Sequence, residues 1–291
     1  MTQNTQLEKQ TRKLIRQQLV HERRLERKLD KDAKNFRTHM AKTYKGVRKA
    51  KRPITVLAEG DSWFSYPVGK SITFHLRNHP KMETLNLASH GDEMTDMLSD
   101  KQRKRLVKEL RRGPQPRRKY DAFVFSGGGN DLLGNDRFRL WIKDYKKGMT
   151  PKQIINKSTL KTMLDYIECR YQEVIDIRDE YSKNTIMYLN AYDFAQPNGE
   201  GVCGRGPWLL PALKYRKVPK KHHEQVVVEL LKIFHKRLEK ISDYSRGIVV
   251  LPTQGTLNKS RWHNEIHPTN KGFKQVAKKF ISAIETDFAR E

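Results

Sequence analysis

The sequence predicts an α/β fold, a three-layer domain around a central five-stranded parallel sheet, with a basic helical extension at its N-terminus. Five short apolar segments rich in β-branched residues alternate with segments of helical pattern, which is typical of α/β domains. The apolar segments are continuous runs, as expected of strands buried on both faces of a parallel sheet. Because this alternation begins after Pro53, we assign residues 1–52 to the extension and residues 53–291 to the α/β domain.

The elements of the α/β domain follow from these local patterns. The strands are predicted at residues 54–58, 84–88, 121–126, 185–191 and 247–252. The helices are predicted at residues 70–78, 94–112, 159–182, 221–243 and 269–286. Since no repeat and no low-complexity linker interrupts the series, we expect all five strands to share one sheet.

Residues 1–50 are predicted to form one long polar helix that ends near Pro53. Its apolar residues form a thin, broken stripe made of Leu7, Leu14, Ile15, Leu19, Leu25 and Leu29. Such a stripe is too thin for an independent core. The helix is therefore expected to lie along the domain, to pair with another chain or to rest on a surface.

Positive charge is concentrated in two parts of the chain, whose formal net charge is +26. Residues 1–52 hold 17 Lys and Arg against 5 Asp and Glu, and residues 101–119 hold ten Lys and Arg against Glu109 alone. Such patches attract nucleic acid or an anionic membrane surface. The alternative is that they are solvated helix faces that keep the protein in solution.

Several classes of protein are excluded by what the sequence lacks. No apolar run approaches the roughly 20 residues that span a bilayer, and the N-terminus has no apolar secretory core. A disulfide framework or a cysteine-based zinc site is not expected with only Cys169 and Cys203 present. We therefore predict no metal and no cofactor, and a location in the cytoplasm or export without a cleaved signal.

Chemically distinctive residues follow four of the five predicted strands. Gly60-Asp61-Ser62 follows the first strand, and Gly91 lies in "SHGDEM" after the second. Asn130 lies in "GGGND" after the third, and His267 lies in "NEIHP" after the fifth. Each motif alone could be a simple turn or a helix cap. Because the carboxyl ends of parallel strands gather at one edge of a sheet, together they predict an active site there.

These segments resemble the conserved blocks of the SGNH hydrolases, also called GDSL lipases/acylhydrolases. "EGDSW" is similar to the nucleophile block, "GGGND" to the Gly-x-Asn-Asp block and "NEIHP" to the Asp-x-x-His-Pro block. The resemblance covers roughly residues 54–285 and leaves the N-terminal segment unexplained. It implies a flavodoxin-like sheet and the hydrolysis of esters or related acyl bonds.

The chemistry of these residues agrees with that resemblance. A serine hydroxyl needs a base to remove its proton, and His267 is the candidate base for Ser62. Attack leaves negative charge on the former carbonyl oxygen, which needs preorganised donors. The backbone N–H groups of Ser62 and Gly91 and the side-chain amide of Asn130 are the candidate oxyanion hole. Asp61 and Asp131 are expected only to shape their loops.

The third member of the catalytic relay departs from the family pattern, because Asn264 stands where aspartate is usual. The Asn264 carbonyl oxygen can hold the His267 tautomer but cannot stabilise an imidazolium as a carboxylate does. Alternatively Glu265 supplies the carboxylate, or a backbone carbonyl holds the ring and leaves a Ser–His dyad, which we favour. A slow or inactive enzyme is the remaining alternative.

A long loop after the fourth strand, residues 191–213, is a candidate lid or substrate wall. Its Trp208, Leu209 and Leu210, with Trp63, Phe64 and Tyr66 beside the serine, would form an apolar acyl-binding wall. The alternative is a packed loop that covers the sheet edge. Two further histidines, His90 and His263, are expected at the rim of the site.

The predicted function is therefore a serine-dependent ester hydrolase that acts through an acyl-Ser62 intermediate. An ester or a lipid at an anionic surface is the expected substrate, because basic segments and an apolar wall accompany the serine. A carbohydrate O-deacetylase would use the same site. A different class of function is a degenerate hydrolase scaffold that binds nucleic acid or an anionic surface.

Overall fold

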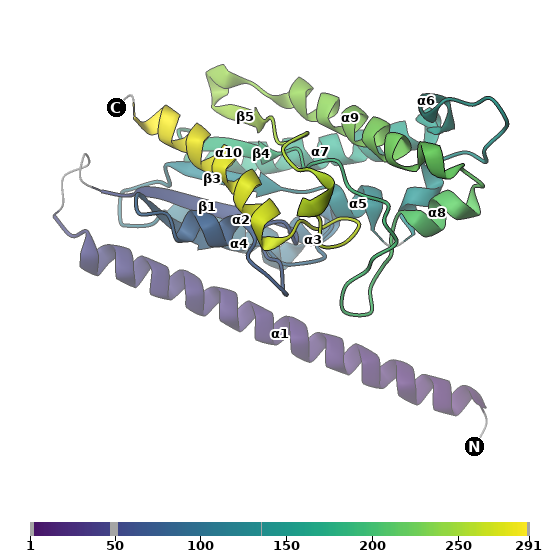
Figure 1. Cartoon of the computed structure of the whole chain (residues 1–291). Coiled ribbons are helices and arrows are strands. Elements are labelled where there is room, and N and C mark those ends of the chain that lie inside the picture. The colour runs from purple at the N-terminus through teal and green to yellow at the C-terminus, as the bar shows by residue number, and fades with distance from the viewer. Residues whose placement is uncertain (1–2, 47–51, 135, 290–291) are drawn as a thin grey trace. The chain divides into compact units, whose positions relative to one another are not determined.

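The five apolar segments form one parallel sheet in the computed structural model, which describes residues 3–46, 52–134 and 136–289 (Figure 1). The strands are β1 (Ile54–Gly60), β2 (Met82–Asn86), β3 (Ala122–Ser126), β4 (Ile186–Asn190) and β5 (Ile248–Leu251). Their order is β2-β1-β3-β4-β5, and every neighbouring pair is parallel. This is the strand order of flavodoxin-like sheets. The predicted fold class is confirmed.

Helices cover both faces of the sheet, and most of the strand residues are buried. The helices that flank the sheet are α2 (Ile72–Arg77), α4 (Asp100–Arg112), α7 (Lys157–Ser182), α9 (His223–Ile241) and α10 (Asn270–Phe288). The helices α4, α7 and α9 pack in a row, whereas α2 packs against α10. Short helices complete the domain: α3 (Met94–Met97), α5 (Gly129–Leu133), α6 (Pro151–Ile154) and α8 (Leu210–Tyr215).

Two predicted elements differ in detail from the structure. The single helix expected at 94–112 is divided into α3 and α4, because Ser99 has extended backbone and begins a second helix. The second strand lies two residues earlier than expected, at Met82–Asn86. Both differences leave the carboxyl ends of the strands at the same edge of the sheet.

The N-terminal segment forms α1 (Gln3–Thr43), a single 41-residue helix. It ends at Thr43 rather than near Pro53, and residues 47–51 lie outside the described part of the chain. The side chains of Leu7 and Leu14, two members of the predicted stripe, also lie outside it. Contacts divide the chain into two units, Met1–Ala50 and Lys51–Glu291. No helix within the described residues is long and apolar enough to cross a membrane.

The end of β1 requires glycine. Gly60 pairs with Ser126 of β3, and a Cβ built at Gly60 would lie only 2.5 Å from the Ser126 carbonyl oxygen. This close approach brings the β1 and β3 ends together just before the Ser62 turn. A side chain at position 60 would force the two strands apart.

We expect Gly60→Ala to lower the free energy of unfolding by about 3 kcal/mol, because the new methyl group overlaps backbone that cannot relax. Urea titration followed by circular dichroism measures the loss. Gly148→Ala is the matched control: Gly148 has a positive φ of 91° but no atom within 4 Å of the added Cβ. Its cost should stay near 1–2 kcal/mol, the strain of a left-handed residue. Equal losses in the two variants would contradict the close-approach argument.

Candidate active site

Ser62 lies in the turn that follows β1, and the side chain of Asp61 holds that turn. Asp61 Oδ1 accepts hydrogen bonds from Trp63 N at 3.0 Å and Ser126 Oγ at 3.1 Å. Asp61 Oδ2 accepts one from Tyr192 OH at 2.5 Å. Burial raises the pKa of Asp61 to about 6. Asp61 therefore shapes the loop, as expected, and leaves the Ser62 hydroxyl to point elsewhere.

Ser62 and His267, which are 205 positions apart in sequence, are in hydrogen-bond contact. Ser62 Oγ lies 2.8 Å from His267 Nε2, and His267 Nδ1 lies 3.1 Å from Asn264 Oδ1. All three side chains are buried or nearly so. The structure thus brings together the three residues that the sequence singled out as nucleophile, base and orienting group.

The tautomer of His267 follows from the hydrogen bonds of Asn264. Asn264 Oδ1 also accepts hydrogen bonds from the backbone N–H groups of Ile266 (3.0 Å) and His267 (2.9 Å). Because those groups can only donate, the atom facing them must be the amide oxygen and not the nitrogen. Nδ1 of His267 therefore carries the ring hydrogen and donates a hydrogen bond to Asn264 Oδ1. Nε2 is left with the lone pair that a serine proton needs.

The network continues behind Asn264 to Tyr66. Asn264 Nδ2 donates to Tyr66 OH at 3.3 Å, and Tyr66 OH lies 2.6 Å from His263 Nδ1. The Tyr66 ring also stacks on the His267 imidazole, with centroids 4.6 Å apart and planes 30° apart. Burial raises the pKa of Tyr66 to about 12, so its hydroxyl stays protonated.

The environment of His267 favours its neutral form. Burial lowers the pKa of His267 to about 3, with further lowering by His263 and His90. No carboxylate within the described residues is hydrogen-bonded to the ring to offset this effect. Glu265, one of the predicted alternatives, does not reach the ring, and the favoured backbone carbonyl is replaced by the Asn264 side chain. His267 is therefore unprotonated and available as a base over most of the pH range, but it is a weak base.

Three donors face the same opening as Ser62 Oγ. The backbone N–H groups of Ser62 and Gly91 donate to no acceptor in the described part of the chain. Gly91 has a φ of +84°, which favours glycine, and it lines the same cleft as Ser62. Asn130 Nδ2 gives one hydrogen to the Asp92 carbonyl oxygen at 2.8 Å, which leaves its second hydrogen for a ligand.

A cleft of about 940 Å³ opens above these groups. Ser62, Gly91, Asn130 and His267 all line it. Apolar side chains from the loop after β4 and from the serine turn form part of its wall, among them Tyr66, Pro67, Val202, Pro207 and Trp208. The cleft is large enough for a substrate with a short acyl or alcohol chain.

The predicted acyl-binding wall is wrong for Phe64 and Leu209, whereas Tyr66 and Trp208 line the cleft. Phe64 has no exposed surface and packs on Phe280, and Leu209 is also completely buried. Trp63 donates to the Ile266 carbonyl oxygen at 3.1 Å and lines a small second pocket of about 20 Å³, which Ser62 also lines. Phe64, which follows the Ser62 turn in sequence, therefore belongs to the hydrophobic core. Trp208 does line the cleft, with its ring edge-on to His267 at 5.9 Å.

Glu265 has a different task from the one considered for it. Its carboxylate is buried and accepts hydrogen bonds from four backbone N–H groups of the loop after β4: Gly199, Trp208, Leu209 and Leu210. The bonds to Gly199 and Leu210 measure 3.1 and 2.8 Å. Glu265 therefore ties both ends of residues 199–210, which form one wall of the cleft, to the segment that carries His267.

Comparison with known proteins supports the fold. No protein-family model and no curated protein matches the sequence. Among solved structures, the lipase Lip_vut3 from a goat rumen metagenome aligns with a TM-score of 0.51 and 15% identity, over 79% of this chain and 97% of the lipase. Phospholipase A1 from Streptomyces albidoflavus aligns with a TM-score of 0.51 and 13% identity, over 79% and 99%. The chain has the SGNH hydrolase fold.

Asn264 stands where the resemblance to the SGNH hydrolases led us to expect an aspartate. The usual position of the aspartate is occupied by an amide that accepts the same bonds from Ile266 N, His267 N and the imidazole. Geometry is thereby kept, whereas the negative charge that stabilises an imidazolium is missing. In place of a carboxylate, the ring of Tyr66 is stacked on His267, and the face of an aromatic ring attracts cations. Tyr66 is therefore positioned to stabilise a positively charged His267.

We expect Tyr66→Leu to lower kcat about 10-fold and Tyr66→Phe to lower it less than about 3-fold, since only the first change removes the ring face. The measurement is turnover of a short neutral ester at pH 7.5. Tyr244→Leu, at an exposed tyrosine, controls for a general loss of stability. Equal losses from leucine and phenylalanine would show instead that the hydroxyl bonds to Asn264 and His263 matter most.

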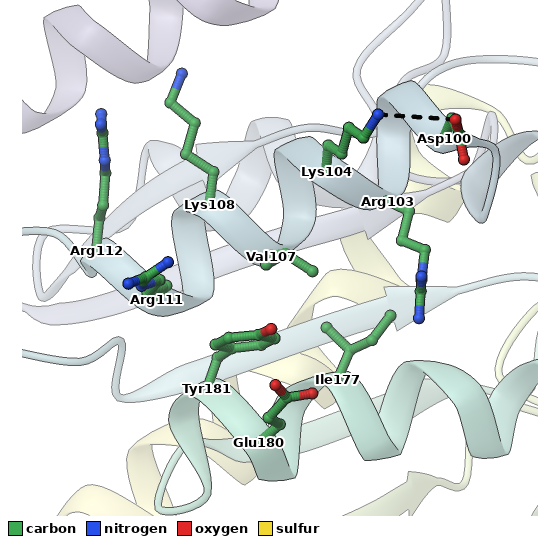
Figure 2. Close-up of a pocket in the computed structure, with 10 residues that line it drawn as sticks. All are labelled: Asp100, Arg103, Lys104, Val107, Lys108, Arg111, Arg112, Ile177, Glu180 and Tyr181. Carbon is green, nitrogen blue, oxygen red and sulfur yellow. Dashed lines mark ion pairs between the residues drawn. The ribbon is translucent and has the colours of Figure 1, made fainter.

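The basic run at residues 101–119 begins on α4. A hollow of about 670 Å³ lies between α4 and α7, and Figure 2 shows Arg103 reaching toward α7 while Lys108 and Arg112 point away. Arg103 forms an ion pair with Glu173 of α7 at 3.3 Å. Part of this positive charge therefore joins two helices. Binding of nucleic acid or anionic lipid by the basic run stays a prediction.

Sequence reasoning missed the supporting residues of the site. The network role of Tyr66, the loop anchor Glu265 and the cation Arg205, which lines the cleft, depend on contacts between segments far apart in sequence. No group of three or more His, Cys, Asp or Glu within the described residues is arranged to hold a metal. His90 lines the cleft, and His263 is exposed beside it.

Proposed function

We propose that the protein is a serine-dependent ester hydrolase that acts through an acyl-Ser62 intermediate. The contact between Ser62 Oγ and His267 Nε2 at 2.8 Å carries the proposal. It joins a nucleophile to a base whose protonated nitrogen is turned away. The SGNH fold and the lipase and phospholipase A1 names of its structural neighbours are consistent with this class of reaction.

The reaction would proceed in two half-steps. In the first, Ser62 Oγ attacks the ester carbonyl carbon as its proton passes to His267 Nε2, and the oxyanion accepts hydrogen bonds from Ser62 N, Gly91 N and Asn130 Nδ2. The C–O bond to the alcohol then breaks, and the alcohol leaves with the proton from Nε2. In the second, water gives a proton to Nε2 and attacks the acyl group, after which Ser62 leaves and recovers its proton.

Reaction of a fluorophosphonate probe and turnover of p-nitrophenyl butyrate test this proposal. Wild type should be labelled and should release p-nitrophenol, whereas Ser62→Ala should do neither. Ser65→Ala is the matched control, because Ser65 belongs to the same turn but bonds to Asp61 through its backbone only. Labelling that persisted in Ser62→Ala, or wild-type protein that neither reacted nor turned over any ester, would overturn the proposal.

We further propose that the substrates are lipid esters presented at an anionic surface. The wall formed by Tyr66, Val202 and Trp208 is apolar, as an acyl chain requires, and α1 carries a strongly basic sequence suited to an anionic surface. We expect faster hydrolysis of short-chain lipid in vesicles containing phosphatidylglycerol than in purely zwitterionic vesicles. A carbohydrate O-deacetylase would instead prefer soluble acetylated sugars and be indifferent to vesicle charge.

A further inference from the structure

Arg205 places a fixed positive charge in the Ser62 cleft. Its side chain lines the cleft together with Ser62 and Asn130, on the side of the candidate oxyanion hole that Gly91 provides. Arg205 Nη1 lies 3.7 Å from the position that a Cβ at Gly91 would occupy. The Gly91 nitrogen is about 2.5 Å from that position by standard geometry, so the guanidinium lies within about 6 Å of the oxyanion donor.

The guanidinium is not used by the protein itself. Its side chain forms no ion pair and no hydrogen bond with any residue in the described ranges. The acidic residue that also lines the cleft, Asp136, is not within ion-pair distance of it. Arginine stays charged at any pH at which proteins fold, and its planar fork suits carboxylate and phosphate groups.

The backbone that carries Arg205 is well held. Val202 and Arg205 exchange two backbone hydrogen bonds, of 2.8 and 2.9 Å, that close a tight turn. The ends of the surrounding loop are tied by Glu265 to Gly199 on one side and to Trp208 on the other. The backbone at Arg205 is therefore already ordered before a ligand binds, and only the exposed side chain has to be ordered by the ligand.

We propose that Arg205 binds an anionic group of the substrate, a carboxylate or a phosphate placed a few bonds from the scissile ester carbonyl. The inference rests on the proposed hydrolase function and names the substrate class of the same site. Arg205 sits on the Gly91 side of the cleft, so the carbonyl oxygen can occupy the oxyanion hole while the anion meets the guanidinium. Neutral esters would use the same oxyanion hole and the apolar wall without this contact.

The test compares esters that differ in the end of the acyl chain. p-Nitrophenyl butyrate is neutral, the mono-p-nitrophenyl ester of succinate ends in a carboxylate, and that of 3-phosphonopropionate ends in a phosphonate. Arg205→Gln should lower kcat/KM about 10-fold for at least one anionic ester, mainly through KM, and change butyrate less than 2-fold. The ester with the larger loss identifies the preferred anion. Arg112→Gln on α4 removes the same charge away from the cleft and should leave all three unchanged.

A binding measurement separates this inference from the proposed function. Calorimetry of Ser62→Ala protein with succinate and with 3-phosphonopropionate needs no turnover. Binding that is weakened about 10-fold by adding Arg205→Gln supports the anion site even if no ester is hydrolysed. An unchanged ratio of anionic to neutral kcat/KM in Arg205→Gln, or no Arg205-dependent binding of either anion when esters are not turned over, overturns it.

Discussion

Replacing His267 with glutamine is expected to lower kcat about 10⁴-fold while KM changes little. Glutamine can hydrogen-bond to Ser62 Oγ but cannot take its proton, so the alcohol oxygen that attacks remains a poor nucleophile. The expected size follows from serine hydrolases in which removal of the base leaves only the oxyanion hole and substrate binding. Steady-state kinetics with p-nitrophenyl butyrate measure the loss, and the fluorophosphonate rate should fall in parallel.

The matched control for this variant is His235→Gln. His235 lies on α9, where its Nε2 is 3.1 Å from Glu239 Oε1. It lines neither the cleft nor the small pocket beside Ser62. It should retain wild-type kcat. A loss of less than 10-fold in His267→Gln, with the melting temperature unchanged, would mean that another group takes the Ser62 proton.

Replacing Asn264 with aspartate is expected to raise kcat about 10- to 100-fold at pH 7.5. The carboxylate can accept the same three bonds from Ile266 N, His267 N and the imidazole, and it adds the charge that stabilises the imidazolium. The reverse change costs about 10⁴ in a chymotrypsin-type enzyme, where the amide also leaves the wrong tautomer. In this protein the tautomer is already correct, so the gain should be smaller.

Wild type and Asn264→Asp should also differ in how their kcat falls at acidic pH. His267 works as a base only when neutral, and its pKa is lowered to about 3 by burial. Activity of the folded wild type should therefore persist as the pH falls from 7 to 5. In Asn264→Asp the added charge raises the pKa of His267, so activity should be lost at higher pH than in wild type.

Asn258→Asp controls for the added charge, because Asn258 accepts a backbone bond from Ser260 in a similar local turn outside the cleft. Its kcat and acid limb should match those of wild type. Identical profiles for wild type and Asn264→Asp would contradict the assigned partner of His267. A fall in kcat would show that the amide hydrogens on Tyr66 OH matter more than the charge.

The sequence predicted the residues that meet at the sheet edge because that convergence follows from topology. Once five strands are parallel, the turns after the neighbouring strands β2, β1 and β3 bring Gly91, Ser62 and Asn130 close together. His267 follows β5 at the other side of the sheet, so it also needs the long segment after β5 to reach Ser62. The partner of the imidazole was not predictable in the same way. Asn264 and Glu265 are adjacent in sequence, and only the folded loop determines that the first turns toward His267 and the second toward Gly199.

The prediction of the acyl-binding wall was partly wrong for a related reason. Apolar side chains beside a catalytic turn look alike in sequence whether they face the cleft or the core, and Phe64 and Leu209 face the core. Arg205 was overlooked as a site residue, and the bonds of Tyr66 to Asn264 and His263 were not predicted, because nothing local in the sequence marks such contacts. Their positions depend on where a long loop settles against distant segments.

Glu265 anchors the loop after β4 at its two ends, through its carboxylate to Gly199 and to Trp208, Leu209 and Leu210, and through its backbone N–H to the Glu200 carbonyl oxygen. The stretch in between, residues 201–207, carries Arg205 and contributes much of the cleft wall, and within the described residues none of its members is hydrogen-bonded to Ser62, Asn264 or His267. We therefore expect that residues 201–207 can be exchanged for other sequences. A segment of different length or composition between the two anchored ends should change which molecules fit the cleft and leave the contacts among Ser62, His267 and Asn264 in place.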